Sequence, residues 1–214
     1  MKKPVLMCAL ILVWAFSARI TASEYYPVDK GYSWTYEGYM KNDPQKPISV
    51  TAVIPSIEKN DGKKYFFYNA PSVDVRYFVR CDESWAYMRV IKYPFPVLNF
   101  LTVDVYLTPE VKFAKFPYRI GDTWDQIISA EAALIPFSMH MDIKCKFTVM
   151  ESEKFTFDGK IYDIFRIRME RDEGNNHIRI EDNWFAEGLG FVRGNTPDYY
   201  IELKKFTTPA EKAK

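Results

Sequence analysis

The chain has 214 residues, of which 48% are hydrophobic and 27% are charged, and its formal net charge is +1. This length is enough for one domain with a sizeable core. Basic and acidic residues are interspersed and do not form the basic patch or stripe that nucleic-acid binding requires. We therefore expect a single globular unit with no nucleic-acid partner.

Residues 1–23 have the pattern of a secretory signal peptide. Lys2 and Lys3 precede an apolar run over residues 5–16, and small residues follow that run. The run is shorter than the roughly 20 residues that span a bilayer, although an uncleaved membrane anchor is an alternative. Removing Lys2, Lys3 and Arg19 from the 29 basic residues leaves 26 against 28 acidic ones, a net charge of −2. We expect an exported chain, in the periplasm, at the cell surface or in the medium, with at most a peripheral membrane association.

Most of the remaining chain alternates apolar and polar residues with a period of two. Trp34 and Tyr36 alternate with polar neighbours, and the pattern recurs over residues 165–170 and 199–204. This period, rich in aromatic and β-branched residues, predicts half-buried strands of an antiparallel sheet. Residues 123–135 fit a helix in part. We favour a strand there, because the motif at its start also opens the strand at Trp34.

Two short motifs occur twice in the same order. The pattern G-x-x-W lies at residues 31–34 and again at 121–124, each time with a proline four residues before the glycine. The pattern D-G-K-x-Y lies at residues 61–65 and again at 158–162. The Asp-Gly pairs suit the positive φ angles of tight hairpin turns. Near-constant offsets in the same order indicate that a meander of four or five strands is duplicated.

A third and looser match pairs Asp82 and Trp85 with Asp182 and Trp184. We expect these tryptophans, together with those of the repeated motif, to pack in the core, where each large ring removes much apolar area from water.

These observations predict an all-β fold with a single domain over residues 24–206. The domain is expected to be an antiparallel sandwich or partly open barrel of about ten strands, formed by two similar meander halves around one core. The halves cover about residues 24–92 and 117–206 and are joined by an apolar connection at 93–116. The tail, residues 207–214, is charged and expected to fray.

Cys81 and Cys145 remain after removal of the leader. Each falls on the apolar phase of its predicted strand, which is Val75, Tyr77, Val79 and Cys81 in one and Met141, Ile143, Cys145 and Phe147 in the other, so both side chains are expected to face the core. An even number of cysteines in an oxidising compartment is consistent with a disulfide. Two buried, unpaired thiols are the alternative, and the sequence does not decide between the two, because pairing depends on the distance between the Cα atoms.

Both ends of the expected mature chain resemble a known family. The stretch Y-P-V-D-K-G-Y-S-W-T-Y, residues 26–36, is similar to the opening of exported bacterial proteins with domain of unknown function 3108. The run D-N-W-F-A-E-G-L-G-F-V-R, residues 182–193, is similar to the closing hairpin of that family, except that Glu187 stands where proline is usual. The resemblance is thin between residues 93 and 118. It implies a secreted or periplasmic antiparallel β protein of bacteria and no established activity.

The sequence contains no motif with a known catalytic mechanism. His140 and His177 have no second histidine or cysteine at ligand spacing, and the glycines form no phosphate-binding loop. Residues 171–176 lack the alternating carboxylates of a calcium loop, so we interpret them as a solvated hairpin end. We expect no catalytic residue, no metal and no cofactor. A hydrolase with an unrecognised pair of carboxylates is a less favoured alternative.

The most unusual segment is the apolar, proline-containing connection at residues 93–116. We select Tyr93, Phe95, Leu98 and Phe100 as candidate ligand-binding residues, because such a segment can line the mouth of a curved sheet. The alternative is an ordinary linker that covers a sheet edge. The expected function is non-catalytic binding of a hydrophobic small molecule, such as a lipid or acyl chain, or of an envelope protein. A structural module that pairs its exposed strands with an envelope complex is a second hypothesis.

Overall fold

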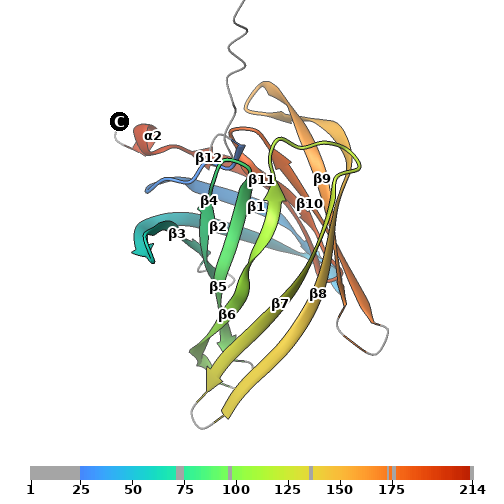
Figure 1. Cartoon of the computed structure of the whole chain (residues 1–214). Coiled ribbons are helices and arrows are strands. Elements are labelled where there is room, and N and C mark those ends of the chain that lie inside the picture. Colours follow the sequence, from blue (N-terminus) through green and yellow to red (C-terminus); the bar gives the residue numbers. More distant parts are fainter. Residues whose placement is uncertain are drawn as a thin grey trace, which may run out of the picture.

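A computed structural model describes residues 25–70, 75–95, 98–134, 137–172, 174 and 177–212. Twelve strands form a closed antiparallel barrel in which each strand pairs with its neighbours in sequence and β1 closes the ring by pairing with β12 (Figure 1). The strands are β1 (Ser33–Met40), β2 (Asp43–Asn60), β3 (Lys63–Ala70), β4 (Val75–Cys81), β5 (Trp85–Phe95), β6 (Leu98–Lys115), β7 (Thr123–Leu134), β8 (Phe137–Phe157), β9 (Lys160–Asp172), β10 (Ile178–Ala186), β11 (Gly190–Asn195) and β12 (Tyr199–Thr207).

The all-β antiparallel prediction is confirmed. The barrel is closed and has twelve strands, whereas a sandwich or a partly open barrel of about ten strands was expected. Residues 123–134 form strand β7, as favoured. The apolar connection lies in β5 and β6, which pair with each other, so it belongs to the first six strands of the barrel. A four-residue helix, α2 (Pro209–Lys212), follows β12, while the expected leader lies outside the described residues. In the described part of the chain, no helix has the length and apolar character needed to cross a bilayer.

The repeated G-x-x-W motif has the same backbone geometry in both copies. Gly31 and Gly121 have φ angles of 97° and 89°, which favour glycine. The amide of Gly31 donates to the Ile54 carbonyl at 2.8 Å, and the amide of Gly121 donates to the Val149 carbonyl at 2.8 Å. In return, the amides of Ile54 and Val149 donate to residues 32 and 122. The motif therefore docks the start of β1 onto β2 and the start of β7 onto β8 in the same way. We refer to β1–β6 and β7–β12 as the two halves of the barrel.

The Asp-Gly motifs also form equivalent turns. Asp61 and Gly62 have φ angles of 50° and 73°, and Asp158 and Gly159 have 47° and 72°. Two consecutive positive φ angles are those of a type I′ turn, which matches the twist of the paired strands. The third, looser match is wrong: Asp82 and Trp85 flank the turn between β4 and β5, whereas Asp182 and Trp184 lie inside β10.

The two halves meet at two seams of unequal length. The β1–β12 seam pairs all eight residues of β1, from Ser33 to Met40, whereas the β6–β7 ladder has four pairs, from Val105–Ala132 to Thr108–Ser129. Beyond that ladder, two side chains of β7 bond to the backbone of β6 where backbone pairs between the two strands are absent from the ladder. The Gln126 carboxamide accepts from the Lys112 amide at 3.0 Å and donates to its carbonyl at 2.8 Å, and the Trp124 indole donates to the same carbonyl at 2.8 Å.

The barrel interior is filled by two hydrophobic clusters. One contains Val79, Phe147 and Ile167 and is built mainly by the strands from β4 to β10. The other contains Trp34 and Leu203 and is built largely by β1–β3 and β10–β12. Trp34 and Trp184 are buried as expected, but Trp85 and Trp124 are half-buried and contact each other edge to face. Tyr77 packs against both clusters, so they form one continuous core.

A carboxylate on β6 links three strands on the first half of the barrel. Glu110 accepts a hydrogen bond from Arg80 Nε on β4 at 2.8 Å and another from the Tyr65 hydroxyl on β3. Burial alone would raise the pKa of Glu110, but the hydrogen bonds from Arg80 and Tyr65 outweigh burial and lower it. The ionised form is therefore the one that the folded barrel stabilises.

A Glu110→Gln variant should be less stable at pH 7 by about 2 kcal/mol, because it removes a charge that pairs with a largely buried arginine. Because the pKa of Glu110 is lowered in the folded state, its contribution is present above the unfolded pKa of about 4.3 and is lost as the pH falls through the folded value. Urea unfolding should therefore give a free energy of unfolding for the variant that is well below that of the parent protein at pH 7. At pH 3 the difference between the two proteins should be smaller. An equal difference at both pH values would contradict this assignment, and Glu58→Gln, at an exposed position of β2, serves as the control.

Candidate functional site

Four strands extend beyond their neighbours at one end of the barrel (Figure 1). The first residues of β8, from Phe137 to Ile143, pair with β7 but not with β9, whose ladder with β8 begins at Lys144. The hairpin of β5 and β6 borders the same end, since Val105 pairs with both Ile91 and Ala132. This extension leaves a stretch of sheet with no strand opposite its β8 edge.

Apolar side chains cover the side of this extension that continues the core. Leu107, Ala130 and Met141 form one cross-strand row, and Ile91 and Val105 belong to the next. We call Met141 and the partly buried Ile91, Val105 and Ile143 the exposed inner face, and the buried Leu107 and Ala130 lie beside them.

The exposure of the strand changes sharply along β8. Residues Met141, Ile143, Cys145 and Phe147 alternate along the strand and therefore share one face. Phe147 is 2% exposed and Cys145 is 5% exposed, whereas Met141 is 55% exposed. Leu107 and Ala130 remain buried beside it. The apolar lining of the core thus continues into solvent at this end of the barrel, among the residues that the structure describes.

The four candidate residues from the sequence lie on the hairpin that borders this face. Tyr93 and Phe95 are near the end of β5, and Leu98 and Phe100 are near the start of β6. The backbone register pairs Tyr93 with Val103 and Phe95 with Leu98. Their side chains lie outside the described part of the structure, so their role stays a prediction.

Charged side chains flank the exposed inner face on the neighbouring strands. Arg171 on β9 pairs with Cys145, and Arg179 on β10 pairs with Arg171, which places both on the core side of the sheet. Glu181 accepts a hydrogen bond from Arg179 Nε at 2.8 Å and lies 3.7 Å from an Arg171 nitrogen. Burial raises the pKa of Cys145 to about 11, with Arg171 lowering and Glu181 raising it, which shows that both charges lie near this thiol. Arg179 also forms an ion pair with Asp198, which lies between β11 and β12, so the two arginines and the two carboxylates balance in charge.

Buried tyrosine hydroxyls lie deeper in the barrel. Tyr77 pairs with Ile91 across β4 and β5 and stacks on Tyr68 with ring centroids 4.7 Å apart. The Tyr77 hydroxyl is hydrogen-bonded to those of Tyr26 and Tyr68, and the Tyr36 hydroxyl lies 3.4 Å from that of Tyr68 and donates to the Phe191 carbonyl. Burial raises the pKa of all four hydroxyls. These hydroxyls are neutral and are hydrogen-bonded within the barrel, so they add no charge to the interior beside the exposed inner face.

The two cysteines are free thiols in the structure, which is the second of the two alternatives that the sequence left open. Cys81 is the last residue of β4, next to the turn into β5, whereas Cys145 lies near the far end of the β8–β9 ladder. They face the same core at different heights along the barrel. Burial raises the pKa of Cys81 to about 12 and that of Cys145 to about 11, so both are protonated and poorly nucleophilic at neutral pH.

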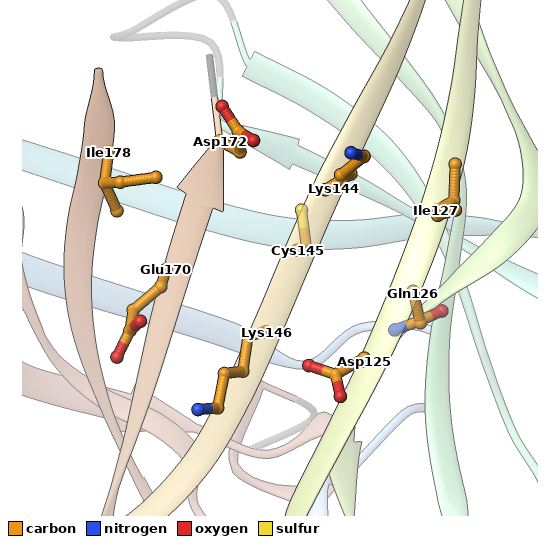
Figure 2. A pocket seen from close by; sticks show the side chains of 9 residues that line it. All are labelled: Asp125, Gln126, Ile127, Lys144, Cys145, Lys146, Glu170, Asp172 and Ile178. Atoms are coloured by element: carbon orange, nitrogen blue, oxygen red, sulfur yellow. The ribbon is translucent and has the colours of Figure 1, made fainter. Parts of the chain in front are cut away.

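A hollow of about 520 Å³ lies over β7, β8, β9 and β10 (Figure 2). Figure 2 shows Lys146 between Asp125 and Glu170, and Lys144 between Ile127 and Asp172. These residues are cross-strand neighbours, and opposite charges at such positions stabilise a sheet. The hollow therefore lies on the outer, solvent-facing side of the barrel.

The histidines form no metal site with other described residues. His140 is exposed and lies 3.5 Å from Glu131 and 3.4 Å from Asp142. No group of three or more metal-ligating side chains occurs within the ranges that the structure covers.

Sequence reasoning missed the residues that define the exposed inner face. Met141 and Ile143 were assigned to the core phase together with Cys145, and alternation gives no signal for where along a strand the core ends. Arg171 was interpreted as part of a solvated hairpin end. Its place on the apolar phase of β9, two residues after Met169, was the signal that could have identified it.

Comparison with known proteins adds no function. No family model matches the chain, and no curated protein matches it. A candidate lipoprotein from Parabacteroides distasonis is 12% identical with a TM-score of 0.49 over 86% of this chain and 98% of its own. An exported protein with a YmcC-like fold from Bacteroides fragilis is 11% identical with a TM-score of 0.49 over 86% and 99%. The hypothetical lipoprotein YmcC from Escherichia coli is 8% identical with a TM-score of 0.43 over 87% and 94%.

Proposed function

We propose that this chain is an exported, non-catalytic envelope protein that binds the acyl chain of a lipid on the exposed inner face. The observation that carries the proposal is the position of Met141, which is 55% exposed on the strand phase that buries Cys145 and Phe147. A chain of methylene groups laid along Met141 and Ile143 would remove apolar surface from water on both partners. Each methylene that becomes buried contributes about 0.8 kcal/mol.

The other functions considered from the sequence have less support. Pairing of a strand with an envelope complex requires an unpaired sheet edge. The ring itself is closed by the pairing of β1 with β12, and the unpaired edge at its end is the short stretch Phe137–Ile143 of β8. A hydrolase of the two-carboxylate type needs an acid whose pKa is raised. In Asp82, Glu110 and Glu202, burial favours a higher pKa, but hydrogen bonds and nearby cations lower it overall. The folded protein therefore favours the ionised form of these three carboxylates, which is not the form that a general acid needs.

The test is binding of N-phenyl-1-naphthylamine, an uncharged hydrophobic dye, and its displacement by fatty alcohols of increasing length. We expect the dye to gain fluorescence on the protein, and each added methylene to increase the affinity of the alcohol by up to about fourfold while the chain fits the face. Absence of binding of the dye and of every fatty alcohol would overturn the proposal.

A Met141→Asp variant should bind dodecanol at least about tenfold more weakly, because an ionised carboxylate on the exposed inner face opposes the burial of an alkyl chain. Ile127→Asp is the matched control: Ile127 is 61% exposed on the neighbouring strand β7 and lies in the outer hollow of Figure 2. Equal losses in both variants, at equal thermal stability, would show that the dye and the alcohol bind elsewhere.

A further inference from the structure

One short edge of the sheet has no strand opposite it. The stretch Phe137–Ile143 of β8 pairs with β7, but its other side faces no strand in the described part of the chain, because the β8–β9 ladder begins at Lys144 (Figure 1). We call this stretch the open edge of β8. In an antiparallel strand, alternate residues direct their backbone N–H and C=O groups to opposite sides. Alternate residues of the open edge therefore present unpaired donors and acceptors.

The barrel has a second stretch of this kind, with a different sequence. In Asp43–Ala52 of β2, the backbone pairs are with β1, whereas the described ladder between β2 and β3 begins at Val53. This stretch carries Pro44, Lys46 and Pro47 at exposed positions. Proline removes a backbone donor and lysine adds a solvated charge, and both keep edge strands from pairing with other chains. The open edge of β8, with the sequence F-S-M-H-M-D-I, contains neither residue and so lacks this protection.

The outer side of the open edge is acidic. His140 and Asp142 are exposed there, and the His140 ring nitrogens lie 3.5 Å from a Glu131 oxygen on β7 and 3.4 Å from an Asp142 oxygen. The other cross-strand neighbours of Asp142 and Glu131 are uncharged. The next lysine along β8, Lys144, is opposite Asp172 on β9, and these two charges balance. Two carboxylates therefore face one imidazole, and the net charge is negative whether or not that imidazole is protonated.

We propose that the open edge of β8 binds an extended strand of another envelope protein, in which apolar and basic side chains alternate. The backbone of that strand would pair with the unpaired groups of the edge. Its apolar side chains would lie on the core side, beside the exposed Met141 and the partly buried Ile143. Its basic side chains would lie on the outer side, opposite Asp142. The edge is short, so the contact is a transient one. This interaction is additional to acyl-chain binding and does not depend on it.

The experiment measures the binding of two labelled heptapeptides by fluorescence anisotropy at pH 7.5, one alternating lysine with valine and the other alternating glutamate with valine. We expect the lysine peptide to bind about fivefold more tightly, because the exposed carboxylates attract one peptide and repel the other. The difference should shrink in added sodium chloride. A lysine peptide with methylated backbone nitrogens cannot donate to the edge and should not bind. Equal binding of the methylated and unmethylated peptides would overturn the proposal.

Reversal of the charge at the edge is the first variant. Asp142→Lys should reverse the preference, so that the glutamate peptide binds more tightly than the lysine peptide. Glu37→Lys is the matched control, because Glu37 is exposed on β1 and pairs there with both β2 and β12. It makes the same change of charge away from the edge and should leave the preference unchanged. If both variants reverse the preference, the peptides respond to net charge and the assignment to the open edge is wrong.

Proline at two adjacent positions tests the backbone of the edge. The amides of His140 and Met141 point to opposite sides of β8, one toward β7 and the other toward the open edge. Of His140→Pro and Met141→Pro, the edge-facing one should keep the parent Tm and bind the lysine peptide about fivefold more weakly, whereas the other should lower the Tm. If both lower the Tm, or if the stable variant binds the peptide as the parent does, the edge is not the docking surface.

Two further outcomes identify what fails. If the protein alone is a dimer in sedimentation equilibrium and the lysine peptide dissociates it, the occupant of the open edge is a second copy and not a basic strand of another protein. If neither peptide binds while dodecanol does, this inference fails and the proposed acyl-chain binding stands. If the peptide binds and no fatty alcohol does, the reverse holds.

Discussion

A Gly38→Ala variant is expected to open the barrel at the β1–β12 seam. Gly38 on β1 pairs with Ile201 on β12. A Cβ atom at position 38 would overlap the Tyr200 carbonyl group, with Tyr200 C at 2.7 Å and Ile201 Cα at 2.8 Å. Backbone atoms cannot move aside as a flexible side chain can, so the two strands would have to separate. We expect a loss of roughly 3 kcal/mol or more, which corresponds to a fall in Tm of about 6–12 °C for a protein of this size.

The matched comparison is Gly121→Ala in the turn before β7. An added Cβ there meets no atom within 4 Å, so the cost comes only from the φ angle of 89°. That conformational cost is about 1–2 kcal/mol. Thermal unfolding followed by circular dichroism should therefore rank Gly38→Ala below Gly121→Ala, and both below the parent protein. A Gly38→Ala protein as stable as Gly121→Ala would mean that the β1–β12 contact is not as close as the structure shows.

The tryptophans of the repeated motif should differ in their contributions to stability, although the sequence presents them as equivalent. Trp34 is 2% exposed, packs against Tyr68 and Phe206, and donates its indole hydrogen to the Leu189 carbonyl at 2.8 Å. Removal of such a side chain costs about 3–5 kcal/mol, so we expect about 4 kcal/mol for Trp34→Ala. Trp124 is half-buried, stacks on Phe147 and donates to Lys112. For Trp124→Ala we expect about 2 kcal/mol, because less of the ring leaves water on folding.

Urea unfolding of the two variants under identical conditions tests this difference. The free energy of unfolding of a domain is about 5–15 kcal/mol. The loss expected for Trp34→Ala is a large fraction of this, so the variant can fail to accumulate as folded protein. Trp34→Phe and Trp124→Phe then provide a milder pair, in which each variant keeps a ring and loses one indole hydrogen bond. Equal losses at the two positions in both pairs would show that the halves contribute symmetrically, contrary to the packing observed here.

Local patterns in the sequence predicted the parts of this fold that depend on neighbouring residues. The two Asp-Gly turns and the two G-x-x-W turns form as expected, because each depends on φ angles that its own glycine permits. Alternation correctly identified Phe147 and Ile167 as inward-facing. It could not predict closure of the ring, because pairing of β1 with β12 joins residues from the two ends of the domain.

The candidate site depends on the height of a residue along the barrel axis. Alternation predicts which face of the sheet a side chain occupies, but it does not predict this height. Met141 and Phe147 have the same phase on β8, but only the first lies beyond the last residue of β9. Height also explains why Cys81 and Cys145 share a core without forming a bond. Which strands overlap, and over what length, follows from ladder register across the whole sheet and not from any one strand.

If the two halves arose by duplication, as the repeated motifs predict, the unequal seams have a consequence for the origin of the chain. In a two-fold arrangement of the halves, β1–β12 and β7–β6 are corresponding junctions, and here one has eight residue pairs and the other four. A single half of six strands would satisfy both of its outer strands by associating with a second copy of itself, giving a symmetric homodimer. Fusion of two such subunits into one polypeptide would allow the two junctions to become different in sequence, so that Gln126 could come to bridge one of them while the other kept its full ladder.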